Sequence, residues 1–199
     1  MAVMGSSGSG KSTFVKRLLQ STQPRRLLIW DPMGEYTADV FTICDTLGQV
    51  LNACCPQSKS RKTFRIVFRP NPNDKTRAKQ FDVFCGIALA MGNLTLIVEE
   101  LRFVTRPSYA PTRWAQVSMQ GRHHGLSVVG TSQRPASIDK DFLGNCTSIR
   151  TGRLAYPEDV KAVAKAMQCP EADIAILKPL EWLQKDMQRG GVTRGKLVF

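Results

Sequence analysis

Residues 5–12 read Gly-Ser-Ser-Gly-Ser-Gly-Lys-Ser and match the pattern G-x-x-x-x-G-K-[ST] at every position. The glycines of such a loop let the backbone curl until successive N–H groups face a phosphate. Lys11 can then reach the β- and γ-phosphates, and the Ser12 hydroxyl can bind Mg²⁺. A helix that follows the loop directs its positive N-terminal end at the same anion. An accidental Gly/Ser-rich turn is the alternative, and the flanking apolar segment and helical pattern argue against it.

We therefore expect this loop to bind ATP together with Mg²⁺. Only Met1 to Met4 precede it, where a buried strand is usual, and we expect them to form a short first strand. A misassigned or trimmed start is the alternative. The residues expected to contact the nucleotide are Gly5, Ser6, Ser7, Gly8, Ser9, Gly10, Lys11, Ser12 and Thr13, with Ser12 also a metal ligand.

The charge balance points to a polyanionic partner. The 199 residues include 28 Lys and Arg against 16 Asp and Glu, a formal net charge of +12. Such an excess is typical of proteins that meet nucleic acid or an anionic membrane surface, although a charged surface without such a partner is the alternative. The basic residues are scattered along the chain and form no tail, which favours a broad charged surface.

Other compositional features exclude several classes of protein. No window approaches the ~20 apolar residues that a transmembrane helix needs, and glycines and serines stand where a signal peptide would have its apolar region. We expect a cytosolic protein. The six cysteines form no C-x-x-C pair and have no histidines at metal-ligand spacing, so we expect reduced thiols and no zinc site.

Apolar runs alternate with helical stretches along the chain, which predicts an α/β fold with a mainly parallel sheet and helices on both faces. We expect one domain over residues 1–199. The predicted strands are Leu27–Trp30, Phe64–Phe68, Leu94–Val98, Leu126–Thr131 and Ser148–Leu154, and the predicted helices are Thr13–Gln20, Ala78–Met91, Ala115–Arg122 and Tyr156–Met167. The predicted loops, with two prolines each, are Pro70–Asp74 and Arg106–Arg113.

The end of the chain, residues 182–199, predicts a β-hairpin that turns at Gly190-Gly191. This hairpin is either an element that docks the protein onto a partner or simply an edge of the sheet. The pattern itself favours neither role.

Two acidic residues, Glu99 and Glu100, come directly after the apolar strand 94–98. In an ATPase with such a phosphate loop, one carboxylate at this place meets the magnesium shell and another orients the attacking water. We assign Glu99 to Mg²⁺, through water, and Glu100 to activation of the water. An acidic cap of the next helix is the alternative. Gln133 follows the strand 126–131 and can contact the γ-phosphate or the lytic water, although an ordinary strand-end polar residue would look the same.

Three of these stretches together resemble the HerA/FtsK superfamily of DNA-pumping ATPases. They are WDPMGEY (residues 30–36), the strand-end acidic pair, and GRHHGLSVVGTSQRPASID (residues 121–139). Members commonly show a D-P-x-G-E-Y-like segment, a D-E pair, and an A-T-Q-R-P-like strand end preceded by a basic residue and a glycine. The resemblance covers about residues 1–153, with Glu99 where the family usually has Asp.

The resemblance implies a P-loop NTPase fold of the RecA/ASCE type and an ATP hydrolase that translocates DNA without sequence preference. Stand-alone members of this size resemble the genome-packaging ATPases of tailless, membrane-containing viruses. The resemblance further implies a homo-oligomeric ring, expected to be a hexamer, and docking to a capsid or membrane protein at a packaging vertex. The expected location is the host cytoplasm, the virion, or both.

Ring motors of this kind complete each site with an arginine from the neighbouring subunit. Arg122 is our candidate, because it matches the family's basic residue before the Gln133 strand. Arg150 and Arg153 are the runners-up, and a solvated arginine at a helix end is the alternative. We also expect Arg102, Arg106 and Arg113, in the loop after the acidic strand, to face DNA.

Two other functions remain open. A P-loop small-molecule kinase would use the basic surface for an anionic acceptor, but the adjacent acids and Gln133 favour a hydrolase. A phage assembly or secretion ATPase is the second, and such proteins typically carry a membrane-spanning segment. Hydrolysis of ATP that is stimulated by DNA would separate the motor from both.

Overall fold

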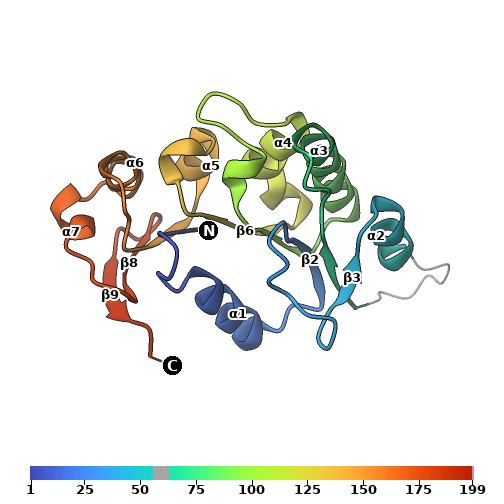
Figure 1. The fold of residues 1–199 in the computed structure, drawn as a ribbon, viewed down its shortest axis with the longest axis horizontal. Coiled ribbons are helices and arrows are strands. Elements are labelled where there is room, and N and C mark those ends of the chain that lie inside the picture. Colours follow the sequence, from blue (N-terminus) through green and yellow to red (C-terminus); the bar gives the residue numbers. More distant parts are fainter. Residues whose placement is uncertain (56–62, 199) are drawn as a thin grey trace.

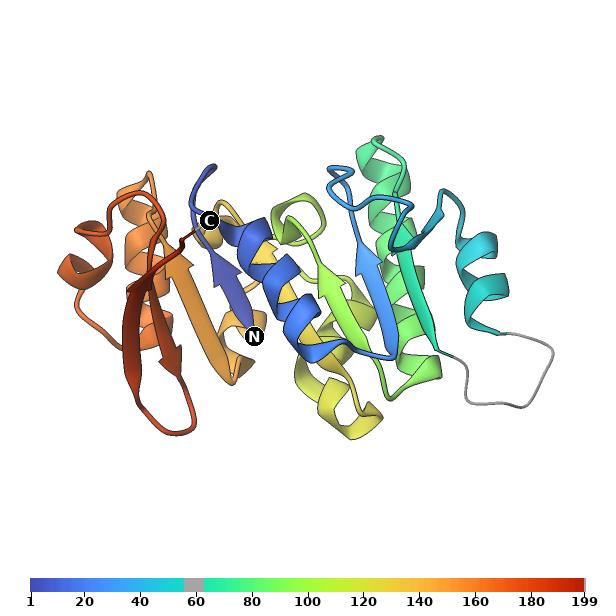
Figure 2. The same cartoon turned by 90° about the horizontal axis from the view of Figure 1, so that it is seen from below.

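The structure, a computed structural model, describes residues 1–55 and 63–198. Its centre is a nine-stranded sheet with the strand order β3-β4-β2-β5-β6-β1-β7-β8-β9. The strands from β3 to β7 in this order run parallel, whereas β8 and β9 are antiparallel to their neighbours. Figures 1 and 2 show the sheet as a twisted layer with helices on both sides.

The strands are β1 (Ala2–Met4), β2 (Arg26–Trp30), β3 (Thr42–Cys44), β4 (Phe64–Phe68), β5 (Thr95–Val98), β6 (Ser127–Ser132), β7 (Ser148–Gly152), β8 (Glu181–Asp186) and β9 (Val192–Lys196). The helices are α1 (Lys11–Thr22), α2 (Leu47–Cys54), α3 (Asp74–Met91), α4 (Thr112–Gln120), α5 (Lys140–Asn145), α6 (Pro157–Met167) and α7 (Glu171–Ala175). The 3₁₀ turns are η1 (Leu101–Phe103), η2 (Gly121–His124) and η3 (Pro135–Ser137).

The two faces of the sheet are covered unequally. Side chains alternate along each strand, so in β2 Leu27 and Ile29 face one side while Leu28 and Trp30 face the other. The first side is covered mainly by α1, which lies alone across the sheet in Figure 2. The second side packs against α2 to α6, where Trp30 meets Phe81 with ring centroids 4.9 Å apart. The central strands β2, β4 and β5 are therefore mostly apolar, as expected for a parallel sheet buried on both faces.

The predicted α/β architecture is confirmed, with differences at several boundaries. Residues 2–4 do form a strand, and β1 lies fully buried between β6 and β7. The predicted loops were too long, because Asp74 already begins α3 and Thr112 begins α4. The helix predicted over 115–122 ends at Gln120 and continues as η2.

The sequence interpretation missed four elements: β3, α2, α5 and α7. Their described lengths of three to eight residues are too short for a clear periodic pattern. The start of α2 did carry a signal, because Thr46 and Gln49 form a capping box.

The predicted terminal hairpin is confirmed for residues up to 198, while Phe199 lies outside the described residues. β8 pairs with β7, so the hairpin extends the sheet and makes β9 its edge strand. After β9 the chain turns towards the start of α1, where a Cβ on Gly10 would lie 2.2 Å from Leu197. Gly10 has a φ of +88°, so its backbone conformation favours glycine.

The parallel strands bring the ends of β1, β5 and β6 to one edge of the sheet. We call this the carboxyl-end edge, and we call the opposite edge, where these strands begin, the amino-end edge. Ligands of open α/β sheets bind outside the carboxyl ends of the strands. The residues that follow Met4, Val98 and Ser132 therefore form the candidate site.

Candidate active site

The loop after β1 places a buried lysine at the carboxyl-end edge. Lys11 is only 9% exposed, and its Nζ donates to the Gly5 carbonyl at 2.8 Å and to the Ser6 carbonyl at 3.4 Å. Burial lowers the pKa of Lys11, while the negative charges of Glu100 and Glu99 act in the opposite direction. The lysine and the two acids therefore share one electrostatic site.

Glu99 is held by two hydroxyl groups from distant parts of the chain. Tyr36 donates its hydroxyl to Glu99 Oε1 at 2.7 Å, and Thr131 donates its own to Glu99 Oε2 at 2.6 Å. Burial raises the pKa of Glu99, and the two hydrogen bonds partly offset this rise because they stabilise the charged carboxylate. Glu99 is thus fixed in orientation on both of its oxygens.

The segment after β2 explains how Tyr36 reaches that carboxylate. The buried Asp31 accepts hydrogen bonds from the backbone N–H groups of Glu35 and Tyr36, both at 3.1 Å. These bonds fold residues 31–36 into a compact turn. The turn directs the Tyr36 side chain inward, where it is 1% exposed. The D-P-M-G-E-Y stretch therefore has a defined structural role: it supplies a hydrogen-bond donor to Glu99.

Glu100 lies in a left-handed backbone conformation, with φ 51° and ψ 60°. Its N–H donates to Thr131 Oγ1 at 3.1 Å, so Thr131 bridges the two acids. Its carboxylate accepts the Gln133 N–H at 3.4 Å and lies 3.4 Å from Arg102 Nε. Non-glycine residues with such a backbone cost roughly 1–3 kcal/mol and are concentrated at active sites.

Gly130 permits this arrangement. A Cβ on Gly130 would lie 2.6 Å from both the Leu101 and Phe142 side chains. The small residue lets η1 pack directly onto β6, which places the residues around Leu101 against the strand that ends beside Gln133. The structure thus brings together the predicted site residues Lys11, Glu100 and Gln133, together with Glu99.

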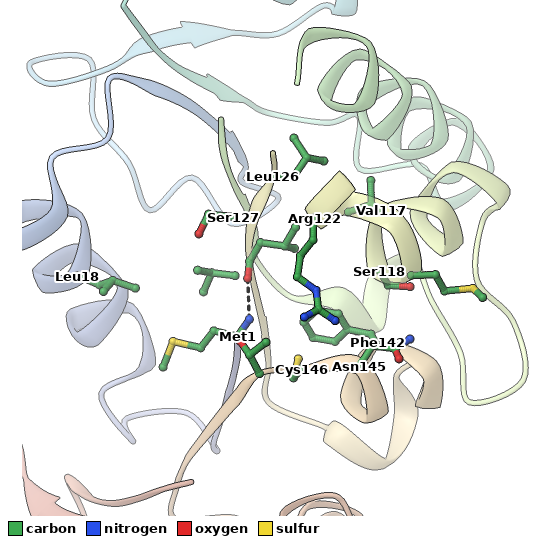
Figure 3. Close-up of a pocket in the computed structure, with 14 residues that line it drawn as sticks. Met1, Leu18, Val117, Ser118, Arg122, Leu126, Ser127, Phe142, Asn145 and Cys146 are labelled. Carbon is green, nitrogen blue, oxygen red and sulfur yellow. Dashed lines mark hydrogen bonds between the residues drawn. The ribbon is translucent and has the colours of Figure 1, made fainter. Parts of the chain in front are cut away.

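Arg122 lies elsewhere, at the amino-end edge. It is exposed in η2, before β6 begins, and lines a cleft of about 410 Å³ with Met1 and Phe142 among its other residues (Figure 3). β6 is six residues long, so at about 3.3 Å per residue the two edges lie roughly 20 Å apart. Arg122 therefore does not join the site of its own chain.

The two runner-up arginines differ in their surroundings. The Arg150 guanidinium is 4.0 Å from the Phe14 ring centroid and 3.7 Å from that of Trp182, and burial lowers the pKa of Arg150 to about 10. An arginine covered in this way by its own chain is poorly placed to reach a neighbour. Arg153 is exposed beside the loop, and its carbonyl accepts the Ser6 N–H at 2.8 Å.

The three arginines expected to face DNA also differ. Arg106 is exposed in a tight turn that is closed by backbone hydrogen bonds with Tyr109. Arg113 belongs to α4 and forms an ion pair with Asp82 at 2.9 Å. Arg102 belongs to η1 and contacts Glu100, a contact that the sequence did not reveal.

The sequence interpretation missed the site contacts of four residues: Asp31, Tyr36, Arg102 and Thr131. Of these, Arg102 was expected only to face DNA. Asp31 and Tyr36 lie in the D-P-M-G-E-Y stretch that carried the family resemblance, so that stretch was the available signal. Thr131 was the last residue of a predicted strand, and this position was the only sequence signal for its role.

In the part of the chain that the structure describes, no helix is both long and apolar enough to cross a membrane.

Comparisons with known proteins show the family and the fold. The chain is 27% identical over 188 residues to protein P9 of Pseudoalteromonas phage PM2, which covers 88% of this chain and 78% of that protein. Among solved structures, it is similar to the genome packaging NTPase B204 of Sulfolobus turreted icosahedral virus 2 in complex with AMPPCP, with a TM-score of 0.74 at 15% identity over 99% of this chain and 96% of that one.

A second solved structure with the same fold is VirB4 of Thermoanaerobacter pseudethanolicus, with a TM-score of 0.72 at 14% identity over 100% of this chain and 89% of that one. The model of the helicase HerA central domain matches residues 1–105, which hold the phosphate loop, the D-P-M-G-E-Y stretch and the acidic pair. Because this match spans more than half of the 199 residues, the chain belongs to the family of the HerA helicase central domain.

Proposed function

We propose that the chain is an ATP-driven motor that moves DNA and packages a viral genome. One observation carries this proposal: three adjacent strands, β5, β6 and β1, end close together. Their ends bring Lys11, the Glu99–Glu100 pair and the backbone N–H of Gln133 into one site. A phosphate loop supplies the nucleotide site, and the acids supply a hydrolytic site beside it.

The donor set fits Mg²⁺. The Ser12 hydroxyl and the Glu99 carboxylate are hard oxygen donors, which Mg²⁺ prefers, and they stand at the same edge of the sheet. Ser12 would hold the ion directly and Glu99 through water, while Tyr36 and Thr131 keep the Glu99 carboxylate oriented. The bound ion would neutralise charge on the phosphates.

The chain's own residues divide the remaining tasks. Lys11 binds the β- and γ-phosphates, and to do so its Nζ exchanges the Gly5 and Ser6 carbonyls for phosphate oxygens. Glu100 accepts the proton of the attacking water. Gln133, whose N–H already contacts Glu100, places its side chain beside the γ-phosphate or the lytic water.

The family and the similar structures support DNA as the partner that the motor moves. The matched family is named for a helicase, and B204 of Sulfolobus turreted icosahedral virus 2 is described as a genome packaging NTPase. B204 of Sulfolobus turreted icosahedral virus is described as a DNA-packaging ATPase. The formal net charge of +12 suits a polyanion. The motor is a single domain over residues 1–199 and acts as a ring, with a hexamer as the expected size. Arg122 acts on the neighbour's nucleotide, and a capsid or membrane protein docks the ring at a packaging vertex in the virion or the host cytoplasm.

The experiment that tests this function is phosphate release from ATP with and without double-stranded and single-stranded DNA. We expect DNA to raise turnover, and we expect DNA binding to weaken steeply between low and physiological salt, as for any partner held through phosphates. Transfer of phosphate to a small acceptor would indicate a kinase. Turnover that no DNA stimulates would contradict the motor and favour a secretion or assembly ATPase.

A further inference from the structure

The carboxylate that we assign to water activation already has a partner within its own chain. Glu100 Oε2 lies 3.4 Å from Arg102 Nε. The Glu100 side chain is 7% exposed, and the Arg102 side chain is 35% exposed. One group of this ion pair is therefore at the catalytic centre, while the other reaches the surface.

The backbone around Glu100 creates the pair. Glu100 takes its left-handed conformation directly before η1, and that short turn brings Arg102 back beside the residue two positions earlier. Arg102 also lies close enough to Lys11 for its positive charge to lower the pKa of that lysine. Arg102 thus acts inside the electrostatic field of the site, although no sequence motif assigns it a role.

Arg102 shares an aromatic ring with a second arginine. Its guanidinium stacks on the Phe103 ring with a distance of 4.8 Å to the centroid, and Arg77 stacks on the same ring at 4.7 Å. Asp74 pairs with Arg77 and partly neutralises it. The exposed Arg106 follows four residues after Arg102 and forms no ion pair with the residues that the structure describes.

We propose that Arg102 restrains Glu100 while no DNA is bound, and that a DNA phosphate draws Arg102 away and frees the carboxylate to activate water. This inference rests on the proposed function, which supplies both the DNA and the role of Glu100. Arg102 is a positioning residue here, because it acts on the reaction through Glu100.

The strength of the pair suits a reversible contact. Strong charge-assisted hydrogen bonds are about 2.7–2.9 Å long, so the distance of 3.4 Å indicates a loose pair. The Arg102 side chain is 35% exposed, so solvent screens part of its attraction to Glu100. A phosphate can hold a guanidinium through two parallel hydrogen bonds, so it competes well for the same arginine.

A restraining role for Arg102 can be distinguished from two simpler roles by the rate of ATP turnover without DNA. A residue that only contacts DNA would lose stimulation on mutation and keep its rate without DNA. A residue that only supports the structure of the site would lower both rates. A residue that restrains Glu100 would, when removed, raise the rate without DNA and lower the ratio of stimulation.

The test measures ATP turnover at saturating nucleotide, with and without DNA, for the wild type, Arg102→Ala and Arg25→Ala. Arg25 is a matched control, because it is an exposed arginine just before β2 at the amino-end edge. We expect Arg102→Ala to raise the DNA-free rate several-fold, towards the DNA-stimulated rate of the wild type. Arg25→Ala should keep the wild-type rates.

Nucleotide binding and thermal unfolding check that each variant is folded. If Arg102→Ala does not fold, Arg102→Gln replaces it, because glutamine removes the charge and keeps a polar side chain over Phe103. The same rise in the DNA-free rate is expected for this variant.

The outcomes separate the inference from the function on which it rests. A wild type that DNA stimulates, together with Arg102 variants whose DNA-free rate is unchanged or lower, overturns the inference and leaves the motor intact. A wild type that DNA does not stimulate overturns the proposed function and the release step together.

Discussion

The two edges of the sheet differ in whether their charged side chains are buried or exposed. At the carboxyl-end edge, Lys11, Glu99 and Glu100 are all at least 90% buried within one site. At the amino-end edge, Arg122 is exposed beside a cleft that is largely apolar. Burying a charge is costly unless it is paired, and at this edge the buried lysine and the two buried acids lie within one electrostatic site. The exposed edge is free to serve a different molecule, and a neighbouring subunit is the one that our proposal requires.

The largest expected effect is the loss of Lys11. Lys11→Ala should abolish measurable ATP turnover, because in the proposed mechanism this buried amine binds the β- and γ-phosphates. Phosphate release and binding of a fluorescent nucleotide measure the effect. Lys161→Ala is the matched control, since Lys161 is exposed on α6. Undiminished turnover in Lys11→Ala would remove the phosphate loop from the mechanism.

The next effect tests whether the amino-end edge serves a neighbour. Arg122→Ala should keep nucleotide binding and lose turnover by about 10³-fold or more, as for an arginine finger. Co-expression with Glu100→Gln should restore part of the activity, because some interfaces then combine an intact Glu100 with an intact Arg122. Arg25→Ala, at the same edge, serves as the control.

Ring formation in these mixtures is confirmed by mass. Absence of rescue in confirmed mixed rings would count against a finger that acts between subunits. A ring whose subunits must hydrolyse ATP one after another could mask the rescue, because an inactive subunit would stop the sequence. Turnover of single sites, measured without DNA, tests for this masking.

The third prediction concerns the two neighbouring acids. Glu100→Gln should retain binding of Mg-ATP and lose about 10²- to 10⁴-fold in turnover, since the shape survives and the proton acceptor does not. Glu99→Gln should instead raise the Mg²⁺ concentration needed for activity. If Glu99→Gln is inactive with intact Mg-ATP binding while Glu100→Gln turns over, the two roles are exchanged.

The smallest expected effect comes from the tyrosine that orients Glu99. Tyr36→Phe removes one hydroxyl from a buried carboxylate, which should cost about 1.5–3 kcal/mol in the free energy of unfolding. The apparent affinity for Mg²⁺ should fall about ten-fold, as for other partners that orient a metal ligand. Denaturant unfolding and Mg²⁺ titration of the ATPase measure the two effects. Tyr109→Phe, at an exposed tyrosine, should change neither value.

The parts of the site that could be predicted are those that are local in sequence. The phosphate loop is continuous from Gly5 to Ser12, and the acids follow an apolar strand directly. Their partners depend on the register of the sheet and on loop folding: Tyr36 is 63 residues from Glu99, and Thr131 is 32 residues from it. No periodicity encodes such pairs, so they had to be read from the structure.

The same reasoning explains the fold. The strand β4 was predicted at its observed bounds, because it is mostly apolar and buried on both faces. The three-residue edge strand β3 carries almost no pattern, and it exists because β4 offers hydrogen bonds along its free side. The ion pair of Arg102 was missed for another reason, because it depends on the left-handed backbone of Glu100.

The position of β1 in the sheet has a consequence for newly made chains. Ala2 lies opposite Gly130 on β6 and Ile149 on β7, so both neighbours are synthesised more than a hundred residues later. At roughly 5–20 residues per second, β1 waits on the order of ten seconds for them. Until then the phosphate loop that follows β1 lacks the neighbouring strands that fix its conformation. We therefore expect a nascent chain to bind ATP only after β7 has been synthesised.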